Sequence, residues 1–317
     1  MSAHVLPLRA PKKPKAMNGR GMARQNLDLI ESARLILERI HPATVRGVCY
    51  QLFTQGAIDS MSAKNVRNVS RLLVVAREKG VVPWEHIVDE TRQEQRVSAW
   101  GGLGDFGETI TRAYRKDFWA HQPAWLKVFS EKSTIGGVIR PVLNEFATIS
   151  FQVMHGYGSA TSLYDVAAES LDADKQTLEI LYVGDFDPSG MHMSEVDLPE
   201  RIERYGGVVD LTRIALKHDD CDGLPSFNVE TKKGDPRYRW FKARHGATCW
   251  ELDAMNPNDL RARLRSEIIA RLDIDAWSHC KRIEEARWYD ATHRPNRACS
   301  RTCEKVRRRL CLFMPLP

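Results

Sequence analysis

The sequence predicts an α/β protein with a mostly parallel sheet, preceded by a winged helix-turn-helix unit. Over residues 123–216, short apolar runs alternate with helical patterns, which is typical of strands connected by crossover helices. Over residues 25–92, three helical patterns occur in a row and the third is basic, as in DNA-binding winged helices. A third observation is a pair of acids, Asp185 and Asp187, directly after a buried strand.

The N-terminal unit is expected to contain three helices and two short strands. Apolar spacing predicts helices over residues 27–40, 44–55 and 63–79, and strands at 81–84 and 87–88. Thr44 and Ser62 are expected to cap the second and third helices. The third helix would enter the major groove, with Lys64, Arg67 and Arg71 as DNA-binding residues. A helical bundle with a solvated basic face remains the alternative.

The α/β region is expected to begin at residue 123. Periodicity predicts strands at 125–130, 149–154, 179–183 and 208–216, and helices at 138–146, 162–170 and about 191–205. Residues 93–122 are interpreted as a connector. Residues 217–317 are interpreted as a C-terminal extension of the α/β domain, with helices at 260–272 and 277–288. Residues 1–24 carry six basic residues and no acid, so we expect a disordered basic tail.

Composition narrows the class of protein. The chain has 317 residues, of which 28% are charged and 43% hydrophobic, and its net charge is +6. These values predict a soluble protein. The basic tail and a second basic cluster at 301–309 could bind nucleic-acid phosphates, and a solubilising role is the alternative. Its seven cysteines include no CxxC pair, which favours a reducing compartment. Because no apolar run could span a bilayer and no secretory signal is visible, we expect a cytoplasmic, nucleoid-associated protein without membrane contact.

Acidic residues follow two of the predicted strands. Asp185 and Asp187 come after the strand that ends at Val183, and Glu131 follows the strand that ends at Ser130. The carboxyl ends of neighbouring parallel strands meet at one edge of a sheet, so the three carboxylates are expected to converge. Oxygen ligands of this kind suit Mg²⁺, and Glu131, Asp185 and Asp187 are the predicted metal ligands. The alternative is that Asp-Pro-Ser-Gly is ordinary turn and helix-cap chemistry.

These residues resemble those of a known family. Glu131-Lys132 after one strand and Asp185-Phe-Asp-Pro-Ser-Gly190 after another resemble the Toprim metal-binding fold of the topoisomerase VI A subunit and of the meiotic double-strand-break transesterase. Gly156-Tyr157 with Thr161 resembles the segment between those motifs. The resemblance covers roughly residues 40–216. It implies that residues 123–216 are a Toprim core and that Lys132 contacts DNA.

The same resemblance implies a nucleophile. The family carries Arg followed by two adjacent aromatic residues on its winged helix, and the matching stretch here is Arg46-Gly-Val-Cys49-Tyr50. Tyr50 would attack phosphorus, and Arg46, four residues earlier on the same helix face, would stabilise the phenolate. Cys49 stands where the family has its first aromatic residue. Tyr50 packing against the helical core is the alternative.

The implied activity is Mg²⁺-dependent DNA cleavage, with rejoining, through a 5′-phosphotyrosyl intermediate; this is a topoisomerase, an isomerase of type IIB-like A-subunit class. Cutting both strands of double-stranded DNA requires two tyrosines and hence a homodimer. No ATPase fold is visible, so strand passage needs a separate ATPase B-type subunit, or the chain is an orphan bacterial or mobile-element A-like member. A Toprim nuclease that uses water and a non-catalytic DNA-binding protein remain alternatives.

Two further stretches carry charge. Arg237 to Arg244 interleaves basic and aromatic residues that could stack on bases or bind phosphates, or form a solvated loop edge. Glu251 and Asp253 follow an apolar run, and we expect a structural or supporting role for them.

Overall fold

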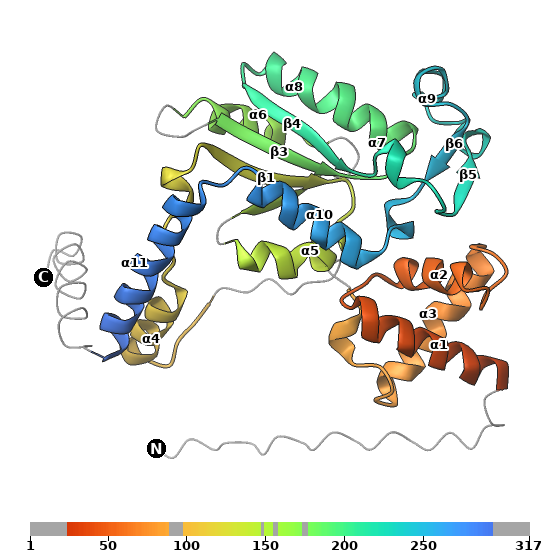
Figure 1. Ribbon diagram of the computed structural model, residues 1–317, viewed down its shortest axis with the longest axis horizontal. Helices are drawn as coiled ribbons and strands as arrows, with labels where there is room; N and C mark the ends of the chain where they lie inside the picture. Colours follow the sequence, from red (N-terminus) through yellow and green to blue (C-terminus); the bar gives the residue numbers. More distant parts are fainter. Residues whose placement is uncertain (1–23, 89–97, 147–148, 155–157, 173–176, 294–317) are drawn as a thin grey trace, which may run out of the picture.

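The computed structural model describes residues 24–88, 98–146, 149–154, 158–172 and 177–293. Within them, a unit of three helices lies at one end of an α/β unit (Figure 1). The basic tail, the Gly156-Tyr157 pair and the basic cluster at 301–309 lie outside the described residues. In these ranges no helix is both long and apolar enough to cross a membrane.

Four parallel strands form the central sheet. They are β1 (Ala124–Ser130), β2 (Ser150–Val153), β3 (Thr177–Val183) and β4 (Val209–Ala215), in the spatial order β2-β1-β3-β4. The predicted parallel α/β architecture is therefore confirmed. Because Ser130 pairs with Val183, β1 and β3 end side by side. The residues that follow these two strands therefore emerge next to each other.

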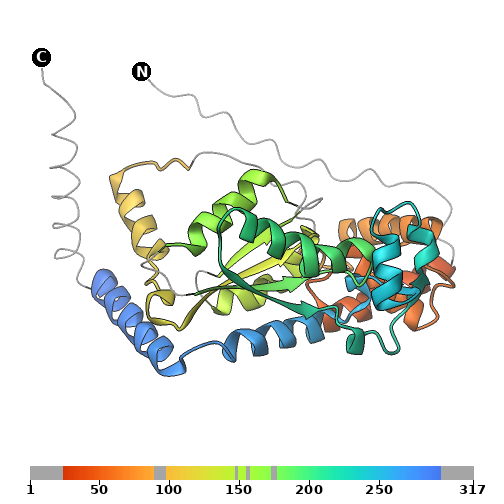
Figure 2. The same ribbon diagram turned by 90° about the horizontal axis from the view of Figure 1, so that it is seen from above.

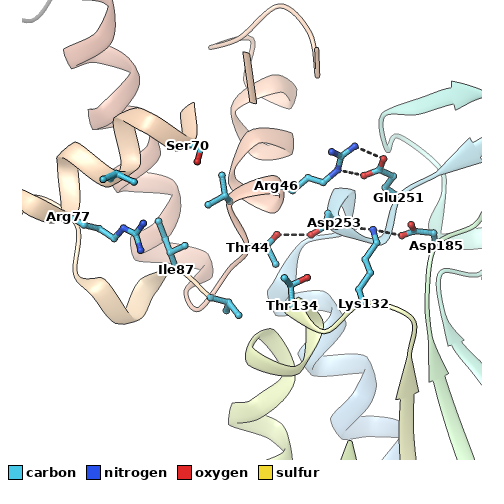
Figure 3. A pocket seen from close by; sticks show the side chains of 13 residues that line it. Thr44, Arg46, Ser70, Arg77, Ile87, Lys132, Thr134, Asp185, Glu251 and Asp253 are labelled. Atoms are coloured by element: carbon cyan, nitrogen blue, oxygen red, sulfur yellow. Dashed lines mark hydrogen bonds and ion pairs between the residues drawn. The ribbon is translucent and has the colours of Figure 1, made fainter. Parts of the chain in front are cut away.

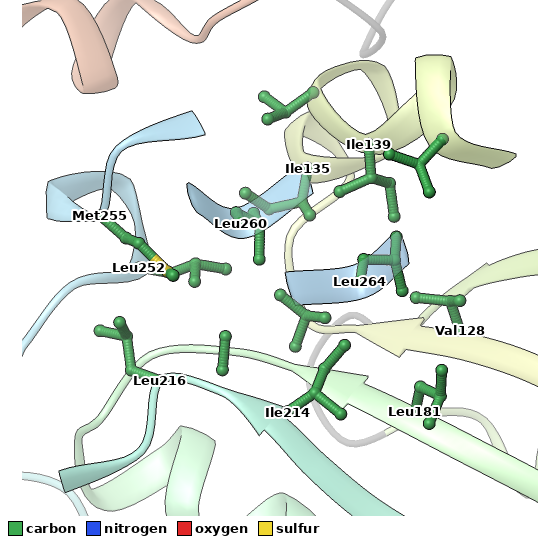
Figure 4. Packing of buried hydrophobic residues seen from close by; sticks show 14 of the residues in the cluster. Val128, Ile135, Ile139, Leu181, Ile214, Leu216, Leu252, Met255, Leu260 and Leu264 are labelled. Atoms are coloured by element: carbon green, nitrogen blue, oxygen red, sulfur yellow. The ribbon is translucent and has the colours of Figure 1, made fainter. Parts of the chain in front are cut away.

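Helices cover both faces of the sheet (Figures 1 and 2). Helices α5 (Thr134–Glu145) and α10 (Pro257–Ile269) cover one face, and α6 (Ala160–Ser170) and α8 (Leu198–Arg204) cover the other. Alternate strand residues point to opposite faces, so Leu181 packs with the first pair of helices and Tyr182 with the second. Figure 4 shows the first of these cores. Between α7 (Pro188–His192) and α8 the chain forms a π-helical segment, Met193–Asp197.

The helical unit has the three predicted helices: α1 (Arg24–Ile40), α2 (Val45–Thr54) and α3 (Ala63–Glu78). Thr44 caps α2 by accepting from the Gly47 amide at 2.9 Å, and Ser62 caps α3. The prediction of two short strands is wrong. Residues Trp84–His86 form a 3-10 turn, and Ile87 makes one isolated bridge to Ala43. Pro83 before this turn has no amide hydrogen to donate to a strand ladder. No two-stranded wing is therefore present in this part of the described chain.

The remaining elements extend the sheet unit at both ends. Helix α4 (Leu103–Ala113) lies inside the predicted connector and packs beside α11 (Ile274–His293), where Arg287 donates to the Tyr114 hydroxyl at 2.8 Å. At the other end, β5 (Ser226–Asn228) pairs antiparallel with β6 (Thr248–Trp250), and α9 (Tyr238–His245) lies between them in sequence. Both predicted C-terminal helices are present, as α10 and within α11.

Candidate functional site

Glu131 and Asp185 meet at the carboxyl edge of the sheet. Glu131 directly follows β1, and Asp185 comes two residues after β3. Burial raises the pKa of Glu131 to about 8, together with the negative charges of Asp185 and Asp187, and the protonated Glu131 carboxyl hydrogen-bonds to Asp185. Burial likewise raises the pKa of Asp185. Two acids from neighbouring strands thus lie in contact, and each makes ionisation of the other less favourable.

Asp187 is close enough to affect Glu131 but is used differently. One of its oxygens accepts from the Gly190 amide at 2.8 Å and caps α7, and the other pairs with the Lys232 ammonium at 3.1 Å. Asp187 therefore acts as a turn and helix-cap residue, which was the alternative to a metal ligand. Among the described residues, no three Asp, Glu, His or Cys side chains are already arranged around a point that could hold a metal ion. Of the three predicted ligands, Glu131 and Asp185 are hydrogen-bonded to each other, and Asp187 instead caps the start of α7.

Lys132 forms ion pairs with Asp185 and Asp253 (Figure 3). Its ammonium lies 2.8 Å from an Asp185 oxygen and 3.0 Å from an Asp253 oxygen. Burial alone would lower the pKa of Lys132, but the charges of Asp185 and Asp253 outweigh it and raise the pKa. The residue predicted to contact DNA is thus held by carboxylates in this conformation.

A second acid-x-acid segment lies beside the first. Phe186 and Trp250 form an antiparallel bridge, with amide-to-carbonyl distances of 2.9 and 3.0 Å, and the Leu252 amide donates to Asp185 at 2.8 Å. The bridge brings Glu251 and Asp253 to the site, where we expected only a supporting role. Glu251 and Asp253 are separated by one residue, as Asp185 and Asp187 are, and that repeat was the available sequence signal.

Arg46 and Tyr50 lie on α2, which docks against this second segment. Arg46 forms a two-pronged ion pair with Glu251 and donates a hydrogen bond to the Tyr50 hydroxyl. Tyr50 is only 4% exposed. Burial and the charge of Glu251 raise the pKa of Tyr50 to about 12, although Arg46 acts in the opposite direction. The predicted nucleophile is therefore a buried, protonated phenol near the acids of its own chain.

A cavity of about 720 Å³ lies between the helical unit and the strand ends (Figure 3). Both signs of charge line it, including Arg46, Arg77, Lys132, Asp185, Glu251 and Asp253. The Thr44 hydroxyl, at the edge of this cavity, donates a hydrogen bond to Asp253 at 2.6 Å. The cavity is therefore a cleft between α2, α3 and the acids, with charged side chains among apolar ones on its wall.

The predicted DNA-binding residues on α3 are exposed. Lys64, Arg67 and Arg71 face solvent, while Val69 and Leu72 of the same helix are buried in the helical core. Arg71 donates to the Asn68 side chain at 3.0 Å. The structure therefore keeps these three cations available at the surface of the helical unit.

Arg213, on β4, holds the acid loop and has no recognisable signature in the sequence. Its guanidinium donates to the backbone oxygens of Gly184, Asp185, Gly190 and Leu216 and to the Ser194 hydroxyl. These five bonds join both ends of the turn that carries Asp185 and Asp187. The shape of that turn consequently depends on one buried cation.

No protein-family model matches this chain, and no curated protein shows detectable similarity to it. The function must therefore be argued from the residues of the site.

Proposed function

We propose that this chain cleaves DNA phosphodiester bonds with Mg²⁺ at the sheet edge where Glu131 and Asp185 meet. The observation that supports this most is the contact between these two acids at the ends of adjacent parallel strands, the edge at which α/β sheets bind ligands. Asp187 lies near them, and carboxylate oxygens suit Mg²⁺. Bound there, the ion would supply positive charge to a phosphate. The exposed cations of α3 and the net charge of +6 support DNA as the substrate.

The lysines of the site are suited to exchange partners during binding. Lys132 pairs with Asp185, and Lys232 pairs with Asp187. An ion held by the carboxylates would take over their neutralisation, and each ammonium could then pair with a phosphate oxygen. Lys132 and Lys232 would thus orient the DNA backbone against the acids.

In the transesterase form of this proposal, Tyr50 is the nucleophile. Its oxygen bonds to phosphorus, and the bond from phosphorus to the 3′ oxygen breaks. The phenol proton is lost to solvent, and the 3′ oxygen takes up a proton from solvent. A 5′-phosphotyrosyl link and a 3′-hydroxyl result, and the reverse reaction rejoins the strand without an energy source. Since Tyr50 is buried, α2 must first leave Glu251 and Asp253. Two such chains would act on a duplex as a homodimer, with a separate ATPase subunit for strand passage.

Hydrolysis by water is the second candidate, and the burial of Tyr50 favours it. A phenol that is 4% exposed, and whose pKa burial raises to about 12, is a poor nucleophile in the docked conformation. Water needs no movement of α2, because the cleft already reaches Asp185. In this form the acids and Lys132 act as proposed and Tyr50 is a structural residue.

One experiment separates the two forms. Supercoiled plasmid is incubated with the protein and Mg²⁺, quenched with detergent, and analysed with and without protease. Cut DNA that migrates freely only after proteolysis, and that is lost in Tyr50→Phe but kept in the exposed control Tyr164→Phe, establishes the tyrosyl route. Free cut ends with Tyr50→Phe establish hydrolysis. Intact DNA with the wild-type protein, or cutting that survives Asp185→Asn, would overturn the proposal.

A further inference from the structure

A second basic surface lies beside the acid site. It comprises the 3-10 turn Val229–Lys232, helix α9 and the residues between them, and we call it the α9 surface. Residues 229–245 include two acids, Glu230 and Asp235, against six Lys and Arg residues: Lys232, Lys233, Arg237, Arg239, Lys242 and Arg244. Apart from Lys232, none of these cations takes part in the acid site described above.

The α9 surface is fastened to the turn that carries the acids. Asp235 accepts from the Ser189 hydroxyl at 2.6 Å, one position beyond the Pro188 that starts α7. The rings of Trp240 and His192 are 5.0 Å apart, and Phe241, fully buried, packs against Phe186. Contacts from three separate residues hold α9 at a fixed position relative to Asp185 and Asp187.

Two arginines on this surface are exposed without an acid partner in the described ranges, and Lys233 is exposed with its ammonium 3.8 Å from Glu230. Arg239 and Arg244 are exposed, and neither forms an ion pair with any acid in the described ranges. The Lys233 side chain is 74% exposed. Over its eight residues α9 spans about 12 Å, the axial length of about three to four phosphates of one DNA strand. The partner that fits is therefore an extended polyanion.

The aromatic residues indicate phosphate contact rather than base stacking. Arg244 lies over the Trp240 ring at 5.5 Å, and His192 covers the same residue from another side. The Tyr238 ring lies under Lys242 at 5.5 Å, and its hydroxyl donates to Glu230. Since both rings already have partners, they are not open platforms for unpaired bases. The exposed guanidinium and ammonium groups remain, and these bind a duplex through its backbone.

Figures 1 and 2 show α9 at the same end of the molecule as α2 and α3, beyond the carboxyl ends of the strands. We propose that the α9 surface binds the phosphate backbone of double-stranded DNA next to the bond that is cut, as a second contact in addition to α3. This inference rests on the proposed function for its substrate. It adds a non-sequence-specific contact on the sheet unit, so that the duplex is held from both sides of the acids.

The test measures binding of a fluorescent DNA duplex of mixed sequence by anisotropy over a series of salt concentrations, in EDTA so that no cleavage occurs. The double variant Arg239→Gln/Arg244→Gln should reduce the slope of log K against log salt by about 1.8, since each phosphate contact contributes about 0.9. The matched control is Lys281→Gln/Arg282→Gln, which removes the same charge from exposed positions of α11 at the opposite end. It should leave the slope nearly unchanged.

An unchanged slope in the α9 variant, or an equal change in the control, would overturn the inference. A wild-type protein that prefers an RNA duplex or an acidic peptide to DNA would overturn the choice of partner. Thermal unfolding of both variants at the wild-type temperature shows that the exposed substitutions leave the fold intact. Because binding is measured without metal, a protein that binds through α9 and never cleaves refutes only the proposed function. Cleavage with an unchanged slope refutes only this inference.

Discussion

Replacing Thr44 with valine tests whether one hydroxyl joins the helical unit to the acid site. The Thr44 oxygen accepts from the Gly47 amide at 2.9 Å and donates to Asp253 at 2.6 Å. Thr44 and Asp253 are both buried. Valine has nearly the same shape and no hydroxyl, so both bonds are lost and no cavity is created.

The expected cost can be worked out from these two bonds. Loss of a helix cap costs about 1 kcal/mol, and loss of a hydrogen bond to a charged acceptor costs about 1.5–3 kcal/mol. Asp253 retains Lys132 at 3.0 Å, so no buried charge is left unpaired. Thr44→Val should therefore lower the free energy of unfolding by about 3 kcal/mol. Thr44→Ser keeps the hydroxyl and should cost less than about 1 kcal/mol. Ser62→Ala removes only a cap, at 3.4 Å, and should cost at most about 1 kcal/mol.

Urea unfolding of these variants supplies the measurement. A double-mutant cycle of Thr44→Val with Asp253→Ala should give a coupling energy of about 2 kcal/mol. If Thr44→Val costs no more than Ser62→Ala, or if the coupling is below about 0.5 kcal/mol, the hydroxyl does not link the two units.

Three other outcomes are expected. Lys132→Met should lower the free energy of unfolding by about 3 kcal/mol in EDTA, because two buried carboxylates lose their ammonium partner. Mg²⁺ should restore part of this stability. Equal losses in thermal unfolding with and without the ion would argue against a cation site. Burial, with a stacked neighbouring imidazole, lowers the pKa of His86. The unfolded chain therefore takes up a proton first, so stability should fall as the pH drops below about 6.5, and His86→Gln should flatten that slope in urea titrations at several pH values. Gly190→Ala would place its Cβ 2.3 Å from the Asp185 backbone oxygen and should lower the free energy of unfolding by about 1–3 kcal/mol. Gly104→Ala, whose Cβ meets open space, should be neutral or stabilising. Similar unfolding midpoints for the two variants would contradict this.

Local patterns were enough to predict most helices and strands. Thr44 and Ser62 cap helices as expected, because a hydroxyl before an apolar helical pattern has few other uses. The start of α5 was predicted four residues late. Gly136 and Gly137 have low helix propensity, but both are buried inside the helix, where packing against the sheet outweighs that propensity.

The site was harder to predict because its contacts join distant segments. Neighbouring strand ends brought Glu131 to Asp185, which the α/β pattern anticipated. The pairing of Lys232 with Asp187 and the arrival of Asp253 depend on how the chain returns after β4, and no local periodicity encodes that. The burial of Tyr50 likewise depends on the docking of α2 and not on the sequence around it.

The bridge between Phe186 and Trp250 separates the acid site from the segment that forms the α9 surface. Two backbone hydrogen bonds close the excursion that leaves after Asp187 and returns before Glu251. Backbone atoms make that closure, so it does not depend on the exposed side chains of the excursion. Exposed residues between β4 and β6, such as Arg239 and Arg244, could change while the acids stay in place. The charge of that surface could therefore change without rebuilding the acid site.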